Sequence, residues 1–172
     1  QGENSNVIKI KQVLKNLAVL LSNLTIIPGS EFFYTVLLYD QSEKEVSGDV
    51  LIEISKPDKS LFQKLLAKSG VSNKIFFEYN FTPGYWVIKA VIGELKESKL
   101  ILVEELEIAS FKLENNSLII TNIGNVPYKK SIEVSIGGIT DLEKIDLDIG
   151  KSREVRLGAP NGEYDIAVND GN

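Results

Sequence analysis

The segment 81–92, Phe-Thr-Pro-Gly-Tyr-Trp-Val-Ile-Lys-Ala-Val-Ile, constrains the fold more than any other part of the chain. From Tyr85 onward its residues alternate with a period of two, and Pro83 and Gly84 supply a turn signal directly before them. Alternation after a turn is typical of a β-strand, and apolar residues on both faces indicate a strand in the middle of a sheet. The segment therefore predicts a β-protein with a buried sheet.

The same pattern occurs again near the C-terminal end of the sequence. Three residues at alternate positions correspond between the two copies, with Tyr164, Ile166 and Val168 standing where Trp86, Ile88 and Ala90 stand. Residues 34–55 also align with residues 116–137 without a gap, at an offset of 82 positions, and the offset is 78 at the Gly-x-Trp/Tyr motif. Because Trp86 and Tyr164 share one position, we expect both to pack in a core. The fold class predicted is all-β, with two tandem immunoglobulin-like antiparallel β-sandwiches.

Short alternating runs predict the strands of the first copy. They fall near 24–27, 32–39, 48–55, 60–67, 74–81, 85–92 and 99–106, and turn-forming residues separate them. Seven short strands at this spacing suit an immunoglobulin-like sandwich, although residues 61–67 also fit a helical turn. We predict an N-terminal extension over 1–22, a sandwich over 23–106 and a second sandwich over 107–172. No flexible linker separates the two, so we expect a stiff joint.

An apolar segment at 7–21 precedes the first predicted sandwich. Its spacing fits a helical stripe and a strand face, and its β-branched start favours extended structure. Only four residues follow Val168, so the second sandwich has no sequence for the last strand that residues 99–106 give the first. We expect an open sheet edge there, which the segment 7–21 of another subunit fills by strand addition. The assembly candidates are Val7, Ile8, Ile10, Val13, Leu14, Leu17, Val19 and Leu21.

Composition argues against most enzymatic and nucleic-acid functions. The chain has no His and no Cys, which removes imidazole, thiolate and the usual zinc and haem ligands. The net charge is −5 and the lysines are dispersed, so nothing predicts nucleic-acid binding. No apolar run reaches the roughly 18 residues of a membrane span. We therefore predict no enzyme activity, no catalytic, cofactor-binding or metal-binding residue, no cofactor, and no membrane span in this chain.

Two motifs that suggest ligands have simpler interpretations. Gly150-Lys151-Ser152 ends like a phosphate loop, but Ile145 occupies the position of the leading glycine, so a turn is predicted. Asp146 and Asp148 offer oxygen atoms to Ca²⁺ without the spacing of an EF-hand loop, which favours solvated turn residues.

Two features bear on location. Asn23, Asn80 and Asn115 each begin an Asn-x-Ser/Thr glycosylation acceptor. The chain starts at Gln1 instead of Met, as a mature product does after signal removal. We therefore predict an extracellular or cell-surface protein, with glycans as possible partners.

Two regions resemble known families. Residues 121–128, Thr-Asn-Ile-Gly-Asn-Val-Pro-Tyr, followed by 147–157, resemble the CARDB/NEW3-like group of bacterial and archaeal cell-surface β-sandwiches. Residues 38–41, 48–54 and 83–86 are similar to macroglobulin-type or fibronectin-like modules that precede such domains in archaeal secreted or membrane-anchored proteins. The resemblance implies a fold and a location, and it brings no catalytic residues.

We predict a non-catalytic extracellular structural protein whose subunits form a homo-oligomer, joined head to tail by donor-strand addition into a filament or surface layer. The alternative is a spacer or a carbohydrate- or protein-binding module from the ectodomain of a membrane-anchored surface protein. In that case residues 7–21 fold back on their own sandwich. A sugar-binding module would also expose aromatic side chains, of which Tyr85 is the leading candidate.

Overall fold

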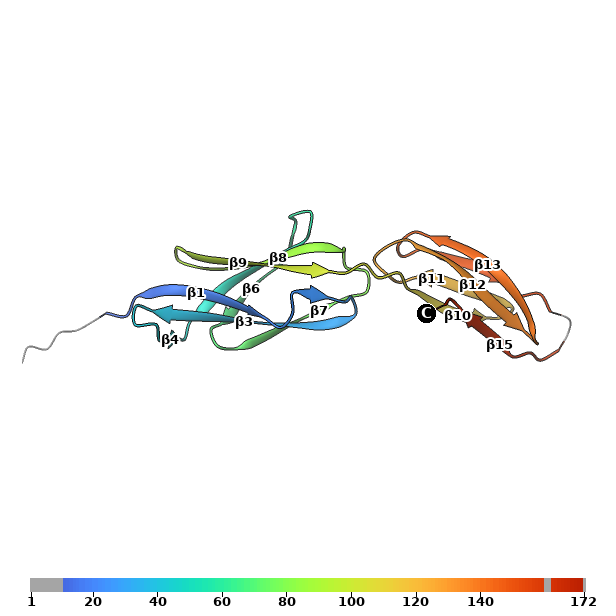
Figure 1. Ribbon diagram of the computed structural model, residues 1–172, viewed down its shortest axis with the longest axis horizontal. Helices are drawn as coiled ribbons and strands as arrows, with labels where there is room; N and C mark the ends of the chain where they lie inside the picture. Colours follow the sequence, from blue (N-terminus) through green and yellow to red (C-terminus); the bar gives the residue numbers. More distant parts are fainter. Residues whose placement is uncertain (1–10, 160–161, 172) are drawn as a thin grey trace, which may run out of the picture. The chain divides into compact units, whose positions relative to one another are not determined.

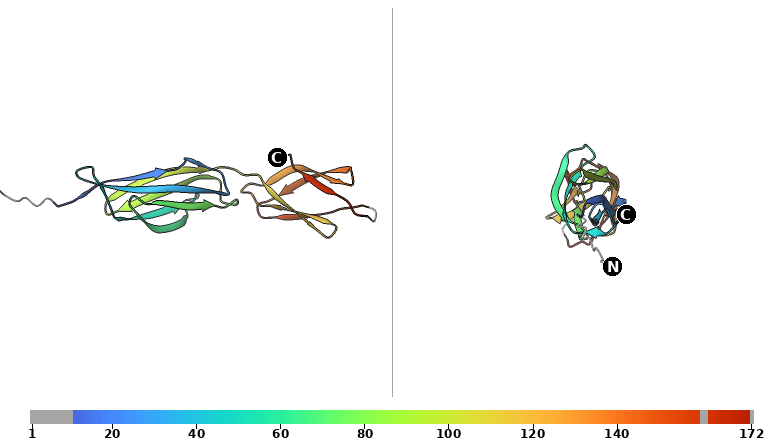
Figure 2. Two further views of the ribbon diagram at one scale, coloured as in Figure 1. Left: turned by 90° about the horizontal axis from the view of Figure 1, so that it is seen from below. Right: turned by 90° about the vertical axis from the view of Figure 1, so that its left-hand side faces the viewer.

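The structure is a computed structural model that describes residues 11–159 and 162–171. Every regular element in these ranges is a β-strand (Figures 1 and 2). The predicted all-β class is therefore confirmed, and residues 61–67 belong to a strand and form no helical turn. The described ranges hold no helix able to cross a membrane.

The strands follow the predicted runs closely. In chain order they are β1 (Leu14–Leu21), β2 (Thr25–Ile26), β3 (Ser30–Asp40), β4 (Glu45–Val46), β5 (Asp49–Ser55), β6 (Leu61–Lys68), β7 (Ser72–Phe77), β8 (Gly84–Ile92), β9 (Leu95–Val103), β10 (Ala109–Glu114), β11 (Ser117–Asn122), β12 (Tyr128–Ile136), β13 (Ile139–Leu147), β14 (Ser152–Arg156) and β15 (Ile166–Asn169). Some boundaries differ from the prediction: β7 ends at Phe77 and not at Phe81, β9 begins at Leu95 and not at Lys99, and the short β4 was not predicted. Gly93 has a φ of 56°, which lets Gly93 and Glu94 alone turn the chain between β8 and β9.

The described residues divide into two compact units. The first contains residues 11–24, 33–75 and 86–100, and the second contains residues 25–32, 76–85, 101–159 and 162–171. Strands β3, β7, β8 and β9 have residues in both units. The domain boundaries at 22 and 106 stay predictions.

One sheet is built around β3. It pairs with β1 antiparallel, which sets Leu17 opposite Leu38 and Val19 opposite Val36, and it also pairs with β4 and β7. Leu17 and Val19 are 5% and 3% exposed. The extended reading of residues 14–21 is therefore confirmed, and burying these side chains removes apolar surface from water.

A five-stranded sheet runs in the order β2-β9-β8-β5-β6. Its β2 and β9 are parallel, and the pairs β5–β6 and β5–β8 are antiparallel. Trp86, Ile88 and Ala90 of β8 are at most 1% exposed, and the rings of Phe62 and Trp86 form a T-shaped pair with centroids 5.3 Å apart. The segment that starts at Tyr85 is thus a central strand of its sheet, as its alternation predicts. Only one face is buried, since Tyr85 is 61% exposed and Val87 and Val91 are half-buried.

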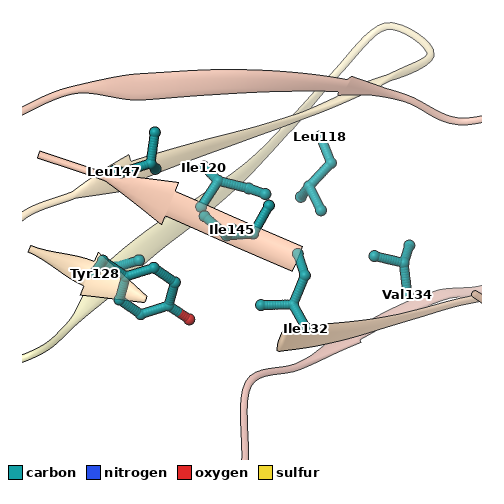
Figure 3. Packing of buried hydrophobic residues seen from close by; sticks show 8 residues of the cluster. Leu118, Ile120, Tyr128, Ile132, Val134, Ile145 and Leu147 are labelled. Carbon is teal, nitrogen blue, oxygen red and sulfur yellow. The ribbon is translucent and has the colours of Figure 1, made fainter. Parts of the chain in front are cut away.

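The remaining strands form two sheets, in the orders β10-β11-β14 and β13-β12-β15. They share a core whose labelled members point toward one another in Figure 3: Leu118, Ile120, Tyr128, Ile132, Val134, Ile145 and Leu147. The Tyr128 hydroxyl is the one polar atom drawn in this cluster, and it donates a hydrogen bond of 3.2 Å to Asp170. Burial and the neighbouring Asp170 carboxylate raise the pKa of Tyr128.

The two copies agree in strand pairing and in register. Strand β11 pairs with β10 and β14 as β3 pairs with β1 and β7, and β12 lies between β13 and β15 as β5 lies between β6 and β8. Glu53 faces Lys64 and Lys89, and Ser135, 82 positions later, faces Thr140 and Ala167. Below, the first repeat means β1 to β9 and the second repeat means β10 to β15. The second repeat has no described counterpart of β9.

Candidate functional site

The assembly candidates fall in β1 or directly ahead of it. Leu17 and Val19 are buried, Leu21 is half-buried, and Val13 and Leu14 are exposed. Val7, Ile8 and Ile10 lie outside the described residues. Because β1 occupies the edge of its own β3, the expectation that residues 14–21 are free to enter another subunit is corrected.

Polar contacts fix the residues that lead into β1. The Gln12 side chain donates to the Asp40 carboxylate at 3.0 Å, and the backbone N–H of Val13 donates to Gln41 Oε1 at 2.7 Å. Gln41 also donates from its own backbone to the Val13 carbonyl and from its side chain to the Lys11 carbonyl. Residues 11–13 are therefore held by their own chain as well.

Asp40 organises this corner of the first repeat. Besides the Gln12 bond, its Oδ1 accepts the backbone N–H groups of Ser42 at 2.8 Å and Lys44 at 3.1 Å. These donors, the Gln12 side chain foremost, lower the pKa of Asp40. Sequence reasoning missed this residue, since one Asp after a strand gives no signal by itself.

Asn122 takes the corresponding place in the second repeat, 82 positions after Asp40. It is fully buried, accepts the backbone N–H of Gly124 at 3.0 Å, and donates to the carbonyls of Val126 and Leu147 at 2.9 and 3.0 Å. The same side chain to backbone turn therefore closes the equivalent strand in both repeats. The first Asn of the Thr-Asn-x-Gly-Asn motif therefore forms the turn that ends β11, a role that the family resemblance did not predict.

Asn125 ends this motif and binds the segment between β9 and β10. Its Oδ1 accepts the backbone N–H of Leu106 at 2.6 Å, and its amide donates to the carbonyls of Glu104 at 2.8 Å and Phe81 at 3.0 Å. The residue is 2% exposed, and all four residues belong to the second unit. We call this arrangement the Asn125 clamp.

Gly124 allows the loop that contains Asn125 to lie directly against the backbone of Leu106 and Ile108. A Cβ at position 124 would collide with the Leu106 carbonyl oxygen, and the backbone N–H groups of Ile123 and Gly124 both donate to the Ile108 carbonyl at 3.1 Å. Only glycine permits this backbone approach. Glu104, Leu106 and Ile108 are thereby bonded to the loop that contains Asn125, and the stiff joint between the two sandwiches stays a prediction.

The edge of β15 is the second notable feature. In the sheet order β13-β12-β15 it is an end strand, and no other described strand pairs with it (Figure 1). Tyr164, just ahead of β15, is 40% exposed, whereas its counterpart Trp86 is 1% exposed. The expectation that both aromatic rings pack in a core is therefore wrong for Tyr164, because the second repeat has no described strand like β9 beside that position.

The three glycosylation acceptors lie outside the strands. Asn23 follows β1, Asn80 lies in the turn after β7, and Asn115 lies in the turn between β10 and β11 with a φ of 52°. All three side chains are exposed, and so is Tyr85, at 61%. The structure thus leaves each acceptor accessible to modification.

The remaining predicted motifs behave as turns or surface residues. Gly150 has a φ of 72° and precedes β14 in a turn, as predicted, and the Lys151 backbone donates to the Asp148 carbonyl at 3.0 Å. Within the described ranges, no three His, Cys, Asp or Glu side chains are grouped as a metal site would need.

Sequence comparison gives no relative, since no family model and no curated protein matches the chain. Solved structures do match. A mutant alpha-2-macroglobulin from Salmonella matches with a TM-score of 0.50 and 16% identity over 95% of this chain and 14% of the other. Trypsin-activated alpha-2-macroglobulin from Escherichia coli gives 0.49 and 13%, over 90% and 14%. A DUF4785 family protein from Legionella pneumophila gives 0.36 and 14%, over 86% and 47%.

These likenesses concern the fold. At 16% identity the Salmonella match supports a shared architecture and nothing about activity, and the chain spans only about one seventh of that macroglobulin's length. Together with the sheets described above, the match supports an immunoglobulin-like β-sandwich of the kind found in macroglobulins.

Proposed function

We propose that the chain is a non-catalytic structural spacer module of a secreted or cell-surface protein. Three observations support this function: the immunoglobulin-like fold, two repeats in one chain, and a connecting segment held by the part-buried hydrogen bonds of Asn125. The Asn125 clamp carries most weight, because a spacer must keep its connecting segment in one conformation.

The finer parts of the proposal rest on sequence. The exposed acceptors Asn23, Asn80 and Asn115 support an extracytoplasmic, glycosylated protein. The Thr-Asn-x-Gly-Asn motif supports a CARDB/NEW3-like second repeat, and the resemblance of the first repeat to modules of archaeal surface proteins supports an archaeal source. Mass spectrometry of the protein purified from its native host would test glycan attachment at each acceptor.

The clamp makes the spacer function testable by one substitution. Asn125→Ala removes three part-buried side-chain hydrogen bonds, including those to the backbone groups of Leu106 and Glu104, a loss of about 1–3 kcal/mol. We expect ¹⁵N heteronuclear NOE values of residues 104–108 to equal those of β9 and β10 in the natural chain. In the variant these values should fall and amide exchange at Leu106 should accelerate.

A matched control is available in Asn23→Ala, which makes the same chemical change at an exposed position. It should leave the NOE values of residues 104–108 unchanged. Low NOE values over 104–108 in the natural chain would contradict the spacer function, whatever the variant does.

A further inference from the structure

The second repeat contains an apolar slot beside β15. Four side chains that are buried in the first repeat have equivalents in the second that are more exposed. The equivalent pairs are Leu17 and Phe111, Val19 and Leu113, Ile88 and Ile166, and Ala90 and Val168. The first member of each pair is at most 5% exposed, whereas Leu113 is 49% exposed and the other three second members are half-buried.

The slot borders the core of the second repeat. Phe111, Ile166 and Val168 all pack against the cluster that contains Tyr128 and Ile132. A hollow of about 270 Å³ with a mixed lining lies at the start of β15, and it is bordered by Ile136, Leu157, Ala159, Tyr164 and Ile166 together with Asn115, Asn116 and Gly162. Apolar surface beside an unpaired strand edge is a site of strand addition.

The first repeat shows what covers the equivalent edge. There β9 lies next to β8 and contributes Ile101 and Val103, which are 0% and 1% exposed. The side chains of β9 alternate, since Leu100, directly before Ile101, is 57% exposed and Leu102, between Ile101 and Val103, is half-buried. The fitting occupant of the β15 edge is therefore an extended strand with aliphatic residues at alternate positions.

We propose that this occupant is the segment 7–10, Val-Ile-Lys-Ile, of a second copy of the chain. Ile8 and Ile10 supply the aliphatic alternation, and Lys9 and Lys11 lie between and after them. Residues 7–10 are outside the described residues. The segment precedes β1, and β3, the strand paired with β1, ends at Asp40 opposite Leu14.

Charge favours the same pairing. Glu163 and Asp165 precede β15 and Asp170 follows it, so the edge is flanked by three carboxylates. Lys9 and Lys11 bring the opposite charge, which steers association and weakens it in salt. The sequence predicts 7–21 as the donor segment. The structure limits the donor to residues ahead of Lys11, because residues 11–21 contact β3 and its following turn.

Such a contact joins different surfaces of the two copies. The donor lies ahead of β1 in one copy and the acceptor is β15 of the next, so each copy retains a free donor or acceptor after pairing. A heterologous contact of this kind grows into an open chain of subunits unless its rotation closes a ring.

Two variants of the full chain separate donor from acceptor. The double variant Ile8→Asp, Ile10→Asp disables the donor, and Val168→Asp disables the acceptor. By sedimentation velocity the natural chain should form concentration-dependent oligomers, and each variant alone should be monomeric. An equimolar mixture of the two should form heterodimers and nothing larger, because one variant keeps its acceptor and the other its donor. Ile139→Asp is the control: Ile139 is 72% exposed on β13, at the far end of the same sheet, and this variant should assemble normally.

A peptide of residues 5–12 provides a measurement that does not depend on variant folding. Its fluorescence anisotropy should rise on binding the donor-disabled chain, and binding should weaken tenfold or more between roughly 0.05 and 0.5 M salt. Hydrogen exchange at residues 166–169 should slow in the complex.

Three outcomes would overturn the proposal. One is a natural chain that stays monomeric at high concentration together with a peptide that fails to bind. Another is normal assembly of the donor-disabled variant, which would show that a different segment or protein fills the edge. The third is a bound peptide that leaves the exchange of residues 166–169 unchanged. None of these outcomes bears on the Asn125 clamp, so the spacer function is tested separately.

Discussion

The two repeats carry the same strand pattern but bury it to different depths. Ile88 and Ala90 are fully buried in β8, whereas Ile166 and Val168, at equivalent positions of β15, are half-buried. The cross-strand partners agree, since Ile54 faces Ile88 and Ile136 faces Ile166. Periodicity thus determines which side of a strand faces inward, and a neighbouring strand determines whether that side is shielded from water.

The repeats also differ in how one row of side chains is joined across the sheet. In the first repeat Glu53 bridges Lys64 at 3.0 Å and Lys89 at 3.1 Å. In the second repeat this row contains Ser135, Thr140 and Ala167, with a hydroxyl to hydroxyl bond of 2.7 Å. One register therefore accommodates a charged row and a neutral row.

The largest expected difference is at the shared aromatic position. Trp86→Ala empties a fully buried site and should destabilise the chain by about 3–5 kcal/mol. Tyr164→Ala removes a ring that is 40% exposed and should cost about 1 kcal/mol or less. The free energies of unfolding of both variants can be compared by urea unfolding monitored by far-UV circular dichroism, a signal that does not require the tryptophan. Equal losses of stability in the two variants would contradict the difference in burial between Trp86 and Tyr164.

A smaller difference is expected where β1 and β10 correspond. Val19→Ala removes two methyl groups from a site that is 3% exposed, which should cost about 2 kcal/mol. Leu113→Ala removes more carbon from a site that is 49% exposed, yet it should cost less than Val19→Ala. If Leu113→Ala proves the more damaging in monomeric protein, then the second repeat is more closed than its exposed side chains indicate.

The smallest effect concerns the charged row. Hydrogen bonds from Lys64 and, to a smaller extent, Lys89 lower the pKa of Glu53. The Glu53 carboxyl therefore ionises more readily in the folded chain than in the unfolded chain, and its ionisation stabilises the fold. This stabilisation is present above the unfolded pKa of about 4.5 and is lost as pH falls through the lower folded value. Unfolding midpoints measured from about pH 6 to about pH 3 should fall less steeply for Glu53→Gln. Ser135→Ala, at the equivalent position, should leave the slope unchanged.

Much of the fold followed from residue spacing. The runs at 32–39, 48–55 and 85–92 lie within β3, β5 and β8 or differ from them by a residue, because turn residues such as Pro83 and Gly84 mark the ends of strands. The gapless alignment of 34–55 with 116–137 also proved to be an agreement of register. These features are local, so sequence alone reveals them.

The site depended on pairings that no local pattern reports. Residues 14–21 were expected to be spare because the first repeat already had seven runs, but the backbone of β3 accepts β1 as an additional strand. The roles of Asn122 and Asn125 also depend on carbonyl groups as distant in sequence as Phe81 and Leu147. Tyr164 was assigned to a core by analogy, and the analogy failed where the strand arrangement differs.

The brevity of β15 has a consequence for selectivity. With four residues, Ile166–Asn169, it exposes few main-chain groups, so main-chain bonding alone holds an incoming segment only weakly. Affinity must come from side chains that match the neighbouring hydrophobic surface, and sequences lacking that match are released quickly. A short edge strand of this kind discriminates among the segments that could add to it, whereas a long edge strand would bind almost any extended polypeptide.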